Sequence, residues 1–111
     1  MKSPPATASL SEEELALFDI LTKPEPVLTK AEQADVKKVC RELLETLRRE
    51  KLVLDWREKQ QAKAGVMQTL KNGMRDLPVQ YTKDIRAEKF ARAYAHVYDH
   101  YYGAGLSAYA A

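Results

Sequence analysis

Two histidines, His96 and His100, lie four residues apart in the sequence, with Asp99 beside the second. On a helix this spacing puts both imidazoles on one face, where they could chelate a metal ion. Functional zinc sites have three or four ligands, and the segment HVYDH lacks the glutamate of an HExxH motif. We therefore interpret the pair as the polar edge of a tyrosine-rich helix and expect no metal or other cofactor.

The usual signatures of catalysis are missing from the sequence. There is no GxxxxGK(S/T) or GxGxxG loop to hold phosphates, and no GxSxG elbow. Cys40 is the single cysteine, so the chain can form no internal disulfide. Its spacing from Val36, Val39 and Leu43 is that of a small buried residue on an apolar helix face. We expect this chain to have no catalytic activity of its own.

Basic residues are concentrated in the middle of the chain. Residues 1–36 contain three Lys and Arg against seven Asp and Glu, whereas residues 37–63 contain nine against five. The candidate nucleic-acid-binding residues are Lys37, Lys38, Arg41, Arg48, Arg49 and Lys59. Charges of one sign are more often the solvated faces of helices, and a net charge of +2 does not by itself indicate a nucleic-acid-binding protein.

Four of the six tyrosines lie within residues 94–102. Tyrosines can form a platform on which the bases of single-stranded nucleic acid stack, but such platforms usually lie in a strongly basic groove. At helical spacing they are more often core residues whose hydroxyls reach the solvent, and we favour this interpretation.

The segment Asp55–Gln61, DWREKQQ, combines one large aromatic residue with several long polar side chains. Trp and Arg are enriched in interface hot spots, so Trp56, Arg57, Gln60 and Gln61 are candidates for docking a protein partner. The alternative is that Trp56 fills one end of a helical bundle while the polar side chains are solvated. We favour a structural role for the tryptophan, because a buried aromatic strongly stabilises a small domain.

The sequence predicts an all-α fold, a compact bundle of about four helices. These helices would position the candidate residues named above. Capping boxes begin three of the helices: Ser11 with Glu14, Thr29 with Glu32, and Asp55 with Glu58. The first helix is expected to stop at residues 23–26, KPEP, the third to run to about Leu77 before Pro78, and the fourth to span about 82–102. Residues 1–10 are predicted to be a flexible lead-in, 11–103 the helical domain, and 104–111 a tail.

Two features of the middle of the chain remain open at this level. Residues 52–54 are three consecutive apolar residues, and they predict a buried connector or a short strand. Gly65 and Gly73 lie inside the third helix, where each costs about 1 kcal/mol relative to alanine unless it admits a close neighbour. No apolar run is long enough to span a membrane and no signal segment is visible, so we expect a cytoplasmic protein.

The order of these segments resembles a known family. LFDILTKPEP, a VKKV–REL–ETL helix, LVLDWREKQQAKAGV, a DLP turn and HVYDHYYG are together similar to the C-terminal helical region of type I restriction enzyme R subunits. The similarity extends from about Leu17 to Gly103. It implies that the chain is part of a much larger protein, an ATP- and Mg-dependent site-specific deoxyribonuclease and DNA translocase.

The resemblance implies a docking role. The family's nuclease and ATP-binding motifs match no position here, so no catalytic residue is carried over. What it does imply is a module that docks the motor onto the methyltransferase and specificity subunits. Asp55, Trp56, Arg57, Gln60 and Gln61 match the family's motif. An alternative is that the basic run in residues 37–63 contacts DNA.

Overall fold

The structure is a computed structural model, and it describes residues 11–103 and 106–108. These residues form four α-helices and a short hairpin. The helices are α1 (Glu12–Thr22), α2 (Lys30–Thr46), α3 (Gln60–Arg75) and α4 (Lys83–His100), and the strands are β1 (Tyr101–Gly103) and β2 (Leu106–Ser107). The predicted all-α bundle is confirmed. The predicted lead-in, residues 1–10, lies outside the described residues.

Side-chain caps determine where three of the helices begin. The Thr29 hydroxyl accepts a hydrogen bond from the Glu32 backbone N–H at 3.2 Å, while the Glu32 carboxylate accepts one from the Thr29 N–H at 2.9 Å. The same reciprocal pair forms between Ser11 and Glu14. At α4 the Thr82 hydroxyl caps alone. These bonds satisfy backbone donors that the first helical turn leaves without partners, and they confirm two of the predicted capping boxes.

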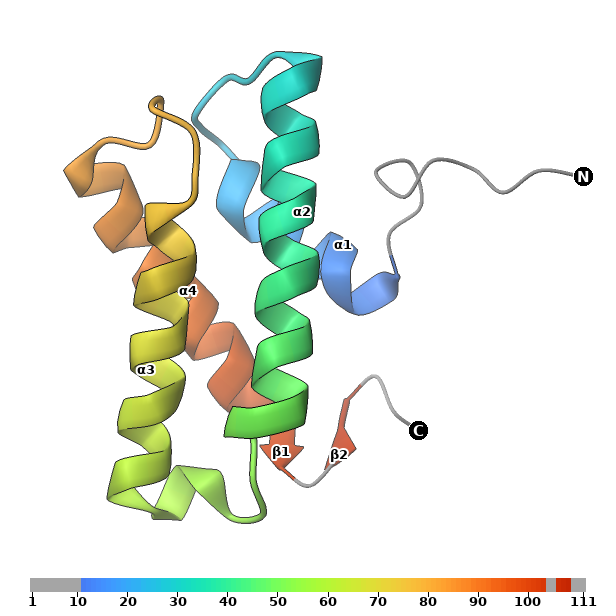
Figure 1. Cartoon of the computed structure of the whole chain (residues 1–111), viewed down its shortest axis with the longest axis vertical. Coiled ribbons are helices and arrows are strands. Elements are labelled where there is room, and N and C mark those ends of the chain that lie inside the picture. Colours follow the sequence, from blue (N-terminus) through green and yellow to red (C-terminus); the bar gives the residue numbers. More distant parts are fainter. Residues whose placement is uncertain (1–10, 104–105, 109–111) are drawn as a thin grey trace, which may run out of the picture.

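The four helices form two layers (Figure 1). Helices α2 and α3 lie side by side, and α1 and α4 cross behind them, with α1 packed on α2 and α4 packed on α3. The core between the layers is apolar and comes from all four helices. Its members include Leu17, Leu21, Val36, Cys40, Leu44, Val66, Leu70, Ala93 and Val97, each no more than 1% exposed. Burying these faces is the main force that holds the bundle together.

The third predicted capping box is wrong. Asp55 has φ 58°, in the left-handed region, and makes no side-chain capping bond. Residues Trp56–Glu58 form a 3₁₀ turn instead, and α3 begins only at Gln60. The tryptophan accounts for the change, because its side chain is fully buried and the backbone turns sharply to bring it into the core.

Other boundaries also differ from the prediction. Helix α3 ends at Arg75 rather than Leu77, and α4 ends at His100, after which β1 pairs with β2 in an antiparallel hairpin that the sequence did not indicate. Helix α2 continues into a π-helical segment, Leu47–Lys51.

The apolar connector is buried only in part. Leu52 is 5% exposed, but Val53 is 43% and Leu54 is 56% exposed, so the expected buried connector is correct for its first residue alone. Residues 53–56 turn sharply, with the Trp56 N–H donating to the Val53 carbonyl at 3.1 Å. Among the described residues, every helix is too short or too polar to span a lipid bilayer.

Candidate interaction surfaces

Trp56 anchors the chain between α2 and α3 to the end of α4. Its indole Nε1–H donates a hydrogen bond to the Tyr101 carbonyl at 3.0 Å, and its ring meets those of Tyr94 and Tyr98 edge-on, at centroid distances of 6.4 and 5.8 Å. The side chain is fully buried. This confirms the structural interpretation of Trp56: the indole presents no surface to a partner and instead positions the residues around it.

Arg57 occupies the solvent side of the same junction. Its Nη1 donates to the Tyr98 carbonyl at 3.1 Å, and its guanidinium lies 5.4 Å from the ring centres of both Tyr98 and Tyr102. Cation–π contacts of this kind stabilise by roughly 0.5–1 kcal/mol at exposed sites. Tyr98 and Tyr102 are 38% and 41% exposed, so the arginine and both rings are held in place yet remain accessible.

Gly103 brings the exposed connector against this group. Its φ is 98°, and a Cβ atom there would lie 2.3 Å from the Val53 carbonyl oxygen, so only glycine permits this approach. This approach brings the backbone of the exposed connector next to Gly103, close in the chain to Tyr102, and we call the exposed connector residues and the arginine–tyrosine group the end patch. It consists of Val53, Leu54, Arg57, Tyr98 and Tyr102.

The tyrosines of residues 94–102 differ in their burial. Tyr101 is 2% exposed and belongs to the core, as we favoured, and Tyr94 is half-buried. Tyr98, which was predicted to face the core, is exposed enough to bind a partner. The other two predicted docking residues, Gln60 and Gln61, are exposed in the first turn of α3, just after Arg57 in the chain.

The predicted nucleic-acid-binding residues do not form a single basic face, because two of them have acidic partners. Arg48 forms an ion pair with Glu13 at 2.9 Å, and Arg49 lies 3.4 Å from both Glu45 and Glu50. These carboxylates offset the charge that the two arginines would present to a phosphate backbone.

Of the other four predicted nucleic-acid-binding residues, three lie on α2 and one lies just before α3. The Lys37 ammonium lies over the Phe18 ring at 5.6 Å, and Arg41 is half-buried on the same helix. Lys38 on α2 and Lys59, just before α3, are exposed. DNA contact through this run stays a prediction.

The imidazole rings of His96 and His100 stack on each other along α4. The two rings are 4.3 Å apart, and the His100 Nδ1–H donates to the His96 carbonyl at 2.9 Å. Burial, followed by the nearby His100, lowers the pKa of His96, and Asp99 opposes this effect. No group of three or more potential metal-ligating side chains occurs in the described part of the chain.

Cys40 lies in the core of the bundle with no exposed surface. Burial raises the pKa of its thiol to about 12, with a smaller contribution from Glu14. Because the thiolate is the nucleophilic form, this cysteine is chemically inert at neutral pH. The prediction that it is a small buried residue is confirmed.

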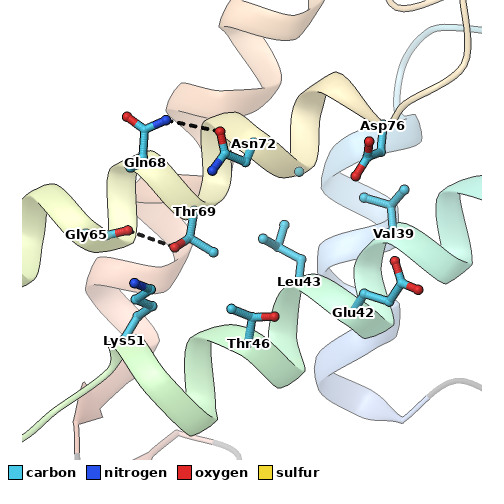
Figure 2. Close-up of a pocket in the computed structure, with 11 residues that line it drawn as sticks. Val39, Glu42, Leu43, Thr46, Lys51, Gly65, Gln68, Thr69, Asn72 and Asp76 are labelled. Carbon is cyan, nitrogen blue, oxygen red and sulfur yellow. Dashed lines mark hydrogen bonds between the residues drawn. The ribbon is translucent and has the colours of Figure 1, made fainter.

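A groove of about 490 Å³ lies between α2 and α3 (Figure 2). Its walls carry side chains of mixed charge and hydrogen-bonding character, among them Glu42, Thr46, Lys51, Gln68, Asn72 and Asp76. Gln68 donates to Asn72 at 3.0 Å, and the Thr69 hydroxyl donates to the Gly65 carbonyl at 2.8 Å. These side chains give the groove both hydrogen-bond donors and acceptors and both signs of charge.

The two glycines of α3, Gly65 and Gly73, line this groove. A Cβ atom at Gly73 would lie 3.1 Å from both terminal methyl groups of Leu43, so this glycine admits a close neighbour. At Gly65 the nearest atom would be 3.8 Å away, an ordinary contact. Gly73 therefore fits the alternative of a close neighbour, whereas Gly65 does not.

A comparison with protein families identifies the family of this chain. Residues 2–100 match the family described as type I restriction enzyme HindI endonuclease subunit-like, C-terminal. No match to a curated protein or to a solved structure was found. The match spans most of the chain and confirms the resemblance noted from its motifs, so this chain belongs to the family of C-terminal domains of HindI-like type I restriction endonuclease subunits.

Proposed function

We propose that this domain docks the ATP-dependent translocase and nuclease subunit onto the methyltransferase–specificity core of a type I restriction complex, and that it contributes no catalytic residue. The observation that carries the proposal is the end patch, where two exposed tyrosines hold a partly buried Arg57 on a well-packed helical domain. The family places that domain at the C-terminus of an endonuclease subunit.

The composition of the end patch suits a protein interface. Tyr and Arg are the residues, together with Trp, that most often dominate binding energy. Val53 and Leu54 add exposed apolar area beside them. A patch of this kind binds a partner mainly by excluding water from apolar and aromatic surface, with the arginine supplying directed hydrogen bonds.

Preorganisation strengthens the argument. The Arg57 side chain is held by one hydrogen bond and two aromatic rings before any partner arrives. Ordering a long side chain on binding costs about 0.5–1.5 kcal/mol, and here much of that ordering is already present. The buried Trp56 beneath it keeps the connector from moving away from α4.

The remaining activities belong, in this proposal, to other parts of the parent subunit. ATP and Mg would bind there, and DNA cleavage would take place there. A cytoplasmic location follows from the same proposal, because the complex acts on DNA.

A charge placed in the end patch tests the docking role. Leu54→Glu adds a carboxylate to apolar surface that a partner would bury, whereas Val27→Glu makes the same change at a residue that is 89% exposed in the loop between α1 and α2, at the opposite end of the bundle (Figure 1). Binding of each purified variant to an immobilised methyltransferase–specificity complex is measured without ATP or DNA. We expect Leu54→Glu to weaken Kd about tenfold or more, which corresponds to about 1.4 kcal/mol, and Val27→Glu to leave it unchanged.

Two outcomes would contradict the proposal. One is no binding by the unmodified chain when circular dichroism shows it to be folded; the other is equal binding by both variants. A third arm titrates a labelled DNA duplex, because phosphate contacts weaken steeply as salt rises. Salt-sensitive duplex binding that Lys38→Glu abolishes would favour the DNA-contacting alternative instead.

A further inference from the structure

A second surface feature lies between the C-terminal half of α3 and the N-terminal half of α4. It is an apolar pocket of about 260 Å³. Met74, Ala87 and Phe90 form its apolar lining, and Met74 is almost completely buried. Pockets for drug-sized ligands measure roughly 300–1,000 Å³. This one is smaller and suits a single apolar side chain.

Three cationic side chains complete the lining: Lys71 and Arg75 from α3, and Arg86 from α4. No carboxylate lines the pocket, and none of the three cations forms an ion pair with a described residue. This contrasts with Arg48 and Arg49, which both have acidic partners.

Arg86, which lines the pocket, has one polar atom that the described residues leave unsatisfied. Its Nε atom is buried and has no hydrogen-bond partner among the described residues. A buried donor without a partner costs roughly 1–3 kcal/mol. A ligand cannot reach the buried Nε itself, but a carboxylate beside the pocket would accept hydrogen bonds from the terminal guanidinium nitrogens, since Arg matches carboxylates in both charge and geometry.

We propose that this pocket binds an acidic segment of a partner protein, with one apolar side chain inserted between Met74 and Phe90 and flanking carboxylates on Lys71, Arg75 and Arg86. The inference rests on the proposed docking function and adds a second contact to it. The occupant is defined by complementarity: an apolar pocket of the size of one side chain, which is lined by the aliphatic parts of three cationic residues and by no acidic residue.

A nucleic acid base fits the pocket less well than a side chain. Bases bind proteins by stacking on aromatic faces. The Phe90 ring already has the Lys71 ammonium over it at 5.6 Å and Tyr94 stacked beside it at 6.4 Å. Little of its face remains for a base, whereas an aliphatic or aromatic side chain needs only the apolar lining.

The test uses the chain alone and defined peptide probes. The ¹⁵N-labelled chain is titrated by NMR with an end-blocked pentapeptide of sequence Glu-Asp-Phe-Asp-Glu. Two control peptides replace its phenylalanine with alanine or its four acids with lysine. We expect amide shifts confined to residues around Arg75 and Arg86, at least fivefold weaker binding of the alanine peptide, and none of the basic one.

Charge reversal on the protein completes the experiment. Arg75→Glu removes one exposed cation that lines the pocket and should weaken the peptide's Kd at least fivefold, whereas Lys38→Glu makes the same change on α2 and should not. Absence of shifts with the acidic peptide would overturn the proposal, as would equal effects of the two reversals. Binding of an oligothymidine at the same amides in place of the peptide would also overturn it. Because no methyltransferase subunit is present, these results are independent of the end-patch experiment.

Discussion

Replacing Trp56 with phenylalanine should destabilise the domain severely without unfolding it. The indole is fully buried, donates a hydrogen bond to the Tyr101 carbonyl and packs edge-on against two tyrosines. Phenylalanine keeps an aromatic ring in the same place but lacks the N–H and two of the ring carbons. The substitution therefore isolates what the larger ring contributes to the junction between the connector and α4.

The expected loss can be worked from these contacts. The hydrogen bond contributes about 1 kcal/mol, and two buried carbons contribute about 0.8 kcal/mol each. The free energy of unfolding should therefore fall by about 2–3 kcal/mol. A domain of this size has a total stability of about 5–15 kcal/mol, so the variant should still fold. Trp56→Ala would lose about 3–5 kcal/mol and is a less informative choice.

The measurement is urea unfolding followed by far-UV circular dichroism, because Trp56 is the only tryptophan and its fluorescence disappears with it. Leu54→Ala, two residues away and 56% exposed, is the matched control and should change stability by less than about 0.5 kcal/mol. If Trp56→Phe is no more destabilising than this control, Trp56 does not hold the junction together, and the argument that it positions the end patch fails.

Two further predictions concern α3 and the histidine pair. Gly65→Ala should raise the free energy of unfolding by up to about 1 kcal/mol through helix propensity, whereas Gly73→Ala should gain nothing or lose stability, because its new methyl group would lie 3.1 Å from both terminal methyls of Leu43. Thermal melts of the two variants check this, and the opposite order would show that the groove is not tightly packed at Gly73. For His96, whose pKa is lowered by burial and then by His100, the unfolded chain takes up the proton first as pH falls below the ordinary value of about 6.5. Stability should therefore drop between pH 7 and pH 5, and His96→Gln should flatten this drop in urea titrations at the two pH values; an unchanged drop would assign the acid sensitivity to other groups.

Much of the fold is readable from local sequence. Ser11 with Glu14 and Thr29 with Glu32 mark helix starts because their bonds span only three residues and need no distant partner. The spacing of Val36 and Cys40 predicts a buried helix face for the same reason, since helical periodicity alone decides which side chains share a face. The motifs that carry the family resemblance are equally local, and the family match confirms them.

Tertiary contacts determined the conformation around Trp56 and the composition of the end patch, which the local sequence pattern did not predict. Asp55 has the sequence of a helix cap but adopts a left-handed conformation, because burying Trp56 against α4 outweighs one capping bond. The end patch joins residues more than forty positions apart, as Arg57 and Tyr98 do, and the Gly103 approach to Val53 that closes it spans a similar distance.

The number of basic residues in the sequence did not predict which of them form ion pairs in the folded chain. The sequence by itself determined how many basic residues lie in the middle of the chain and which helix faces are apolar. Only the tertiary structure decided which cations are neutralised, as Arg48 is by Glu13, and which are left with no ion pair to a described residue, as Arg75 is. The physical reason is range: capping and periodicity act within one or two helical turns, whereas ion pairing and burial depend on segments that only folding brings together.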